Sequence, residues 1–189
     1  MNLQRLAFSL NSLALALITA VLGGAFVEQI AFGELPCPLC LLQRAGLIAV
    51  GLGFLLNLRF GIQPLNYGVT LLGALAGAAA SVRQILLHIA PGDPGYSKAI
   101  FGFHLYTWSF VTFVCIITGV AVLLCLSNNT HNGRPVFAGR ITGLVMLAFL
   151  AIVFGNLAST LLECGFTQCG DDPVRYLWLD SLSHIFKAP

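Results

Sequence analysis

Charged side chains are scarce in this sequence of 189 residues: Asp, Glu, Lys and Arg make up 8% of it, against about a quarter in a typical soluble domain. Hydrophobic residues make up 58%, and the mean hydropathy is +0.90. This composition excludes a soluble globular protein and indicates a membrane protein. The net charge of +2 is too small to suggest binding to nucleic acid. The sequence also lacks internal repeats, low-complexity tracts and any segment that would form a separate soluble domain.

Five apolar segments are long enough to cross a bilayer as helices, which takes roughly 20 residues each. The predicted spans cover residues 6–27, 39–58, 67–90, 106–126 and 141–162, and turn-forming residues separate them. The first segment is longer than the apolar core of a signal peptide, and no convincing cleavage site follows it, so we expect a retained helix. The predicted fold is an all-α membrane protein, with a bundle of five transmembrane helices over residues 1–162 and an external tail over residues 163–189.

Charge is placed unevenly along the chain. The N-terminus and the second and fourth connections contain arginines and no acid: Arg5, Arg59, Arg134 and Arg140. All seven acids lie in the first and third connections and in the tail. Cytoplasmic connections are normally enriched in Lys and Arg. The distribution therefore predicts a cytoplasmic N-terminus, with the first and third connections and the C-terminus outside.

Four of the six cysteines fall on the predicted external side, where disulfides persist. They form two closely spaced pairs, one before the second span and one after the fifth: Cys37 with Cys40, and Cys164 with Cys169. The other two, Cys115 and Cys125, lie within the fourth span. We expect these two to behave as small apolar residues without a redox role.

The C-x-x-C pair Cys37 and Cys40 has three explanations. A zinc site would need two further ligands, which the second pair could supply, but zinc is not favoured in an oxidising compartment. A purely structural disulfide over four residues would remove little entropy from the unfolded chain. An exchangeable redox pair is favoured, because Pro38 can begin a helix and the N–H groups of its first turn would stabilise a Cys40 thiolate. Arg44, one turn further on, adds a positive charge.

Arg44 and Arg83 both lie inside predicted spans, near their outer ends. An arginine at the centre of a bilayer costs on the order of 3 kcal/mol, and either side chain could instead extend to the headgroups. Their depth, close to that of the cysteine pair, indicates a pocket between helices for an apolar molecule with electronegative oxygens. Gln84, His88 and His104 flank the same level and are further candidates, although either histidine could equally be an interfacial or hydrogen-bonded residue.

The segment "PCPLCLLQR" at residues 36–44 resembles the P-C-x-L-C-x-x-x-R signature of the bacterial disulfide bond formation protein B (DsbB) family. Arg83 with Gln84, and "GFHLYTWSF" at 102–110, resemble further regions of that family, so the resemblance covers residues 1–126. It implies a helical bundle that passes electrons from a soluble thioredoxin-like oxidase to a membrane quinone. It also implies that Cys40 faces the quinone, that Cys37 exchanges with a second cysteine pair, and that Arg44 helps to hold the quinone.

The sequence departs from the family in its third connection, which usually carries the second pair but here contains no cysteine. Cys164 and Cys169 follow an additional fifth span, and the odd number of spans places them outside. We expect this pair to be catalytic together with the first, although a plain structural disulfide is the alternative. In the tail, Asp171 or Asp172 before Pro173 predicts a short amphipathic helix. It would lie in the outer interface or pack against the bundle.

The expected protein is therefore a quinone-dependent oxidoreductase of the bacterial inner membrane, using ubiquinone or menaquinone and no metal. It would reoxidise a periplasmic DsbA-type partner and act as a monomer within membrane lipid. One alternative is a quinone reductase resembling the vitamin K epoxide reductases, but these carry their C-x-x-C on a late helix. Another is a small transporter or structural subunit. The intramembrane charges of this sequence cluster at one face of the membrane, which argues against a path for transport through it.

Overall fold

The computed structural model describes residues 3–33, 35–96, 99–126, 139–167, 169, 170, 173 and 176–178. Over these residues it contains five helices and no strand: α1 (Leu3–Phe32), α2 (Pro38–Phe60), α3 (Pro64–Leu87), α4 (Leu105–Leu126) and α5 (Arg140–Cys164). Each helix is long and apolar enough to cross a membrane. The predicted all-α membrane bundle is confirmed.

The helix ends differ from the predicted spans where local signals compete. α1 continues to Phe32, because no helix-breaking residue precedes Gly33, which has a φ of 66°. α3 ends at Leu87 instead of residue 90, since the His88 N–H closes the last turn on Gln84 and Ile85 and a proline follows at position 91. The amphipathic helix predicted after Pro173 falls mainly on residues outside the described ranges.

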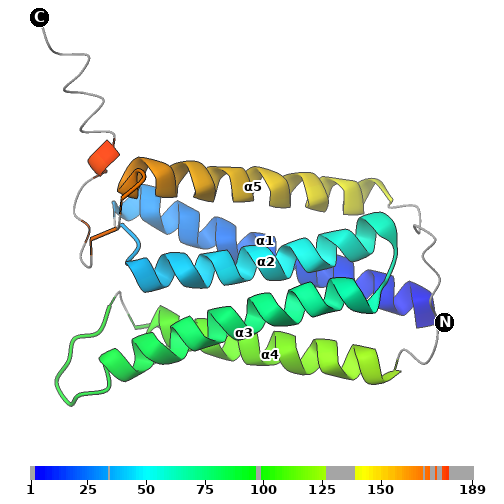
Figure 1. Ribbon diagram of the computed structural model, residues 1–189, viewed down its shortest axis with the longest axis horizontal. Coiled ribbons are helices and arrows are strands. Elements are labelled where there is room, and N and C mark those ends of the chain that lie inside the picture. Colours follow the sequence, from blue (N-terminus) through cyan, green and yellow to red (C-terminus); the bar gives the residue numbers. More distant parts are fainter. Residues whose placement is uncertain are drawn as a thin grey trace, which may run out of the picture.

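The helices run side by side along the long axis of the molecule (Figure 1). α2 lies at the centre and contacts α1, α3 and α5, while α4 packs on α3 and α5 packs on α1. α2 and α5 run in opposite directions, so the start of α2 and the end of α5 meet at one end of the bundle (Figure 1). We call this the disulfide end, because it carries Cys37, Cys40, Cys164 and Cys169.

The closest helix approach, between α2 and α3, depends on residues without a side chain. A Cβ atom placed on Gly46 would lie 2.8 Å from the Cα atom of Gly77, too close for the two backbones to stay in place. Such contacts between small residues let membrane helices pack tightly, since there is little hydrophobic driving force between them in lipid. The approach holds the start of α2 firmly against α3.

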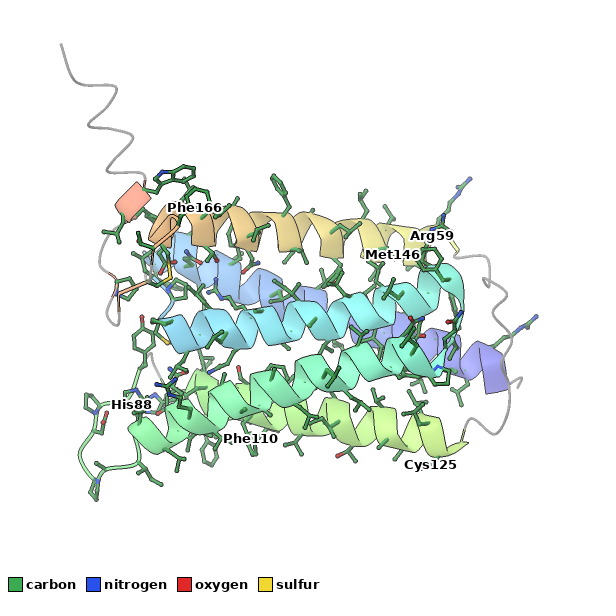
Figure 2. All side chains as sticks on the ribbon, in the orientation of Figure 1. Arg59, His88, Phe110, Cys125, Met146 and Phe166 are labelled. Carbon is green, nitrogen blue, oxygen red and sulfur yellow. A yellow bond between two sulfur atoms is a disulfide. The ribbon has the colours of Figure 1, made fainter. Side chains whose placement is uncertain are left out.

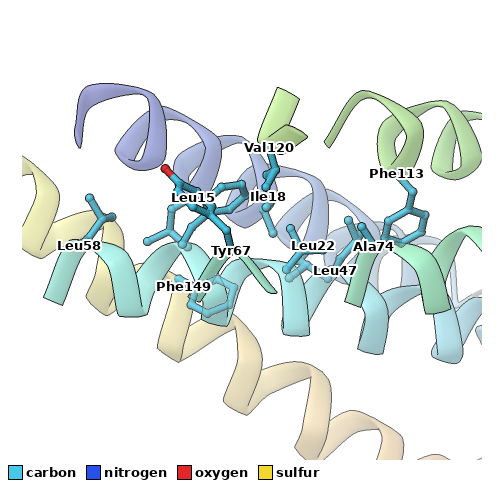
Figure 3. Packing of buried hydrophobic residues seen from close by; sticks show 12 residues of the cluster. Leu15, Ile18, Leu22, Leu47, Leu58, Tyr67, Ala74, Phe113, Val120 and Phe149 are labelled. Atoms are coloured by element: carbon cyan, nitrogen blue, oxygen red, sulfur yellow. The ribbon is translucent and has the colours of Figure 1, made fainter. Parts of the chain in front are cut away.

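All five helices contribute to one apolar core (Figure 3), with Leu15, Val50, Tyr67, Phe113 and Phe149 among its buried members. The outward faces are also apolar, and large side chains such as Leu72 and Phe154 are more than 70% exposed. Exposed apolar surface on this scale is unusual for a soluble monomer. It fits a bundle surrounded by lipid.

The end opposite the disulfides holds a compact set of neutral polar side chains. Asn11 Nδ2 donates to the Tyr67 hydroxyl at 2.7 Å, and Asn57 Nδ2 donates to Asn11 Oδ1 at 3.0 Å. The Gln63 backbone N–H in turn donates to Asn57 Oδ1 at 3.0 Å. We call these four residues the amide network. It links α1, α2 and α3 through side chains whose polar groups bond one another.

Candidate active site

The first disulfide joins Cys37 and Cys40 at the beginning of α2. Cys37 is the N-cap residue, its sulfur accepts the Cys40 backbone N–H at 3.1 Å, and Pro38 begins the helix as the sequence predicts. Cys37 is only 5% exposed, whereas Cys40 is half-buried. The cap therefore fixes both sulfurs within the first helical turn and leaves Cys40 the more open of the two.

The side chain of Gln84, on α3, contacts both sulfurs of this disulfide. Its Nε2 donates toward Cys37 Sγ at 3.4 Å and Cys40 Sγ at 3.6 Å, and its Oε1 accepts from Gln43 Nε2 at 2.7 Å. Both glutamines are buried. A buried amide donor that faces both sulfurs can stabilise negative charge on whichever sulfur leaves when the disulfide opens.

Arg44 lies one turn further along α2 and joins three helices. Its guanidinium donates to Gln29 Oε1 at 2.8 Å and to the Ala25 carbonyl at 3.0 Å, both on α1, and to Asn156 Oδ1 on α5 at 3.3 Å. All three acceptors are neutral. A guanidinium has five N–H donors, so these bonds leave two without a partner among the described residues. Arg44 keeps its full positive charge and part of its hydrogen-bonding capacity.

A cavity of about 440 Å³ opens beside these residues. Cys40, Arg44 and Gln84 line one part of it, and the remaining wall is largely apolar, with Leu22, Leu47 and Trp108 among its members. Tyr96 contributes from the connection between α3 and α4, and Tyr106 from the first turn of α4. The Tyr96 hydroxyl donates to the Leu35 carbonyl at 2.6 Å. The cavity thus combines one sulfur of the first disulfide, a cation and largely apolar walls.

The structure does not bring Arg83, His88 or His104 into this cavity. Successive helical residues differ in direction by about 100°, so Gln84 points inward while Arg83 is exposed and lines a separate groove between α2 and α3. His88 and His104 instead each stack against the Tyr106 ring, with centroid distances of 5.7 and 5.2 Å. The histidines lie behind a residue of the cavity wall.

His88 also forms a side-chain hydrogen bond with Asp93, with Nδ1 and Oδ1 3.0 Å apart. The Gly95 backbone N–H donates to the same carboxylate oxygen at 2.8 Å. These bonds, the Gly95 bond first, hold the pKa of the exposed Asp93 carboxyl below its usual value. The pair organises the connection after α3 and does not touch the cavity.

The second disulfide joins Cys164, the last residue of α5, to Cys169. Gly165 ends the helix with a φ of 63°, and its N–H donates to the Leu161 carbonyl at 2.8 Å. Cys164 is 4% exposed and Cys169 is half-buried. Phe166 stands 88% exposed beside the pair and is labelled in Figure 2, at the same end of the bundle as His88. Arg59 and Cys125 mark the opposite end (Figure 2).

The family model for "Disulfide bond formation protein DsbB" matches residues 7–97, which include Cys37, Cys40 and Arg44. A disulfide bond formation protein B of Chromobacterium violaceum is 31% identical over 156 residues, covering 77% of this chain and 84% of that protein. The chain belongs to the DsbB family. The protein of the same name from Pseudomonas syringae pv. tomato is 41% identical over 78 residues, or 39% of this chain and 46% of that protein. No solved structure matches the chain.

The DsbB family match therefore covers α1 to α3 and the first disulfide, while Cys164 and Cys169 lie beyond the region that the family model matches. The two disulfides fit the description of an atypical member with its second pair in the tail. Disulfide formation in a membrane is thus the general activity that family membership supports, and the roles of single residues remain to be proposed.

Sequence reasoning missed three residues of this site: Gln29, Asn156 and Glu163. Gln29 accepts from Arg44 and donates from Nε2 to Ser159 Oγ at 2.7 Å and to the Tyr176 hydroxyl at 3.1 Å. Gln29 and Asn156 are amide side chains within apolar segments of the sequence. A buried amide needs a hydrogen-bond partner, so their positions could have indicated a polar contact between helices. Glu163 was counted only as an external acid, yet it is 1% exposed.

Proposed function

We propose that this DsbB-family protein is a thiol:quinone oxidoreductase that reoxidises a periplasmic, thioredoxin-like disulfide-forming protein of the DsbA type. The observation that carries the proposal is the cavity in which Cys40 and Arg44 share a wall with apolar side chains. A redox-active sulfur beside an apolar cavity suits an oxidant that is itself apolar and confined to the membrane.

The residues of the cavity fit a quinone, whose ring oxygens accept hydrogen bonds and whose tail is apolar. Arg44 has two N–H donors beyond those used by Gln29, Ala25 and Asn156, and these would hold a ring oxygen. Leu22, Leu47 and Trp108 would contact the ring and tail. A bound quinone supplies the oxidising power, because it takes up two electrons and two protons.

Cys40 is the sulfur that we assign to the cavity, because Cys40 lines it whereas Cys37 does not. When the first disulfide opens at Cys37, Cys40 leaves with the electron pair as a thiolate. The N-terminal turn of α2, the Gln84 amide and the positive charge of Arg44 all favour that thiolate. Charges fixed in place before the reaction stabilise the developing anion without reorganisation.

Cys164 and Cys169 would carry electrons from the partner to the first pair. Thiol–disulfide exchange requires access to one sulfur, and Cys169 is the more exposed of the two. The partner thiolate would therefore attack Cys169, and Cys164 would leave with the electron pair as a thiolate that takes up a proton from water, which makes it the buried thiol nearer the bundle. The exposed Phe166 next to the pair offers an apolar contact for the partner.

This function requires the disulfide end to face the periplasm of a bacterial inner membrane. Arg5, Arg59 and Arg140 lie toward the other end, at helix ends that the positive-inside rule would place in the cytoplasm. The N-terminus would then be cytoplasmic and the tail periplasmic, where disulfides persist.

The decisive experiment replaces Cys40 with serine and follows quinone reduction by absorbance, with a reduced thioredoxin-like protein as electron donor. We expect Cys40→Ser to abolish the reaction. Cys115→Ser is the matched control, because Cys115 is an exposed free thiol on α4 away from both disulfides. Full activity in Cys40→Ser would refute the proposed function.

A further inference from the structure

Glu163 is the most anomalous ionisable residue among those described. Its side chain is 1% exposed, and neither carboxylate oxygen has a hydrogen-bond partner among the residues that the structure describes. Burying a carboxyl group without partners is costly, so buried polar groups left unsatisfied in a folded protein call for an explanation. The proposed electron path does not yet use this residue, although Cys164 follows it directly in the sequence.

The helix register places Glu163 level with the first disulfide. Arg44 of α2 contacts Asn156 of α5 at 3.3 Å, which defines one level in the bundle. Cys37 precedes Arg44 by seven residues and Glu163 follows Asn156 by seven. Because α2 and α5 run in opposite directions (Figure 1), both lie about 10 Å from that level toward the same end. Glu163 and Cys37 therefore share a layer.

Within the described part of the chain, Glu163 has one cationic neighbour in this layer. It interacts electrostatically with Arg44, without a hydrogen bond between them. The other titratable groups that act on Arg44 are Glu28 of α1, Tyr96 of the connection between α3 and α4, and Tyr176 of the tail. Among the described residues Arg44 thus faces carboxyl and phenol groups and no second cation.

We propose that Glu163 is the proton acceptor for Cys164 during electron transfer from the tail pair to the first disulfide. The inference rests on the proposed function, since it assumes that Cys164 attacks Cys37. Before the exchange Glu163 carries the negative charge beside Arg44. After the exchange the Cys40 thiolate carries that charge, and Glu163 is protonated.

The step balances in atoms and electrons. The S–H bond of Cys164 breaks and its proton moves to the Glu163 carboxylate. The Cys164 thiolate attacks Cys37 Sγ, a Cys164–Cys37 disulfide forms, and the Cys37–Cys40 bond breaks. Cys40 leaves with the electron pair as a thiolate lining the cavity. One negative charge has moved from Glu163 to Cys40, and the total charge of the buried layer is unchanged, which avoids creating a new charge in a medium of low dielectric constant.

The test uses the full-length protein with Cys169→Ser, reconstituted in phospholipid nanodiscs. In this background the free Cys164 thiol exchanges with Cys37–Cys40 and cannot return to Cys169. Samples equilibrated between about pH 7 and 8, below the ordinary pKa of a thiol, are quenched with acid. Free thiols are alkylated, and the Cys164–Cys37 linkage is quantified by mass spectrometry.

With Glu163 present, the exchange releases no proton to solvent, so the ratio of linked to unlinked protein should not change with pH. With Glu163→Gln added, one proton is released for each linkage, and the ratio should rise tenfold per pH unit. Glu163→Asp should restore the flat profile. Asp93→Asn is the matched control, since Asp93 is an acid at the same end that does not line the cavity, and it should leave the profile flat.

Equal pH dependence with Glu163 and with Gln at this position would overturn the inference and leave the proposed function standing. A tenfold rise per pH unit in the Cys169→Ser parent alone would also overturn it, and this measurement does not depend on whether a Glu163 variant folds. If no linkage forms in any variant, the tail pair does not feed the first pair, and both the shuttle role and the inference fail.

Discussion

The two ends of the bundle bury polar side chains in opposite ways. In the amide network, Asn11, Asn57 and Tyr67 bond one another, and every partner is neutral. At the disulfide end, counting only described residues, Arg44 gives its charged hydrogen bonds to neutral oxygens and the Glu163 carboxyl has no hydrogen bond. In the amide network the buried polar groups are already paired with one another. The disulfide end retains a cation with spare donors and a group able to bind a proton.

The difference shows at which end the fold tolerates a loss of stability. A satisfied neutral network stabilises helix packing and specifies how α1, α2 and α3 meet. Unpaired buried charges weaken packing, and such features cluster at functional sites. The comparison predicts that substitutions at the disulfide end change chemistry more than stability, and that substitutions in the amide network do the reverse.

Arg44→Ala should have the largest effect on chemistry among these substitutions. It removes the positive charge beside Cys40 together with the two unused N–H donors. We expect the apparent KM for quinone to rise and kcat/KM to fall roughly 100-fold, the scale seen when one preorganised donor to a developing anion is removed. Steady-state quinone reduction measures both constants. An unchanged KM would remove the role assigned to Arg44.

Arg44→Lys sharpens the same prediction. Lysine keeps the charge but cannot reach Gln29, Ala25 and Asn156 with a planar fork of donors. We expect intermediate activity, with the KM for quinone between those of the parent and Arg44→Ala. Activity equal to that of the parent would show that charge alone matters.

Asn57→Ala should have the largest effect on stability. It leaves the Asn11 Oδ1 atom and the Gln63 N–H without their partner at the opposite end of the bundle. Asn11 is fully buried, so its unsatisfied Oδ1 atom costs about 1–3 kcal/mol, and the melting temperature in detergent should fall. Quinone reduction per folded molecule should not change. Loss of activity without loss of stability would contradict the contrast between the two ends.

Much of this arrangement follows from the sequence, and the remainder depends on how the helices rotate against one another. The hydrophobic runs predict five spans because length and composition decide that question. The Pro38 helix start and the C-x-x-C pair could be predicted because both are local. Arg83 and Gln84 were assigned together to the site, yet only Gln84 faces it. Which face of α3 turns inward depends on contacts such as Gly46 with Gly77, which no local pattern encodes.

The hydrogen-bond partners of Arg44 could not be predicted from the sequence either, because they depend on how the helices pack. Gln29 and Asn156 are separated from Arg44 by 15 and 112 positions in the sequence. Their contact requires that α1 and α5 both pack on α2, an arrangement that the order of the helices alone does not determine. Glu163 lies near the end of an apolar run, where an acid is normally solvated. Its burial became visible only once α5 was placed against α1 and α2.

Asp93→Asn should give the smallest effect, because its contact with His88 is exposed and exposed polar pairs contribute little. The pKa of Asp93 is lowered in the folded protein, by the Gly95 N–H first and by His88 second. Its stabilising contribution is therefore complete above the ordinary carboxyl pKa and is lost as the pH falls through the lower, folded value. The Gly95 amide resonance in NMR spectra should titrate at that lower pH in the parent and not in Asp93→Asn. A titration at or above the ordinary carboxyl pKa would show that the bond does not persist, and the connection after α3 would then need another source of order.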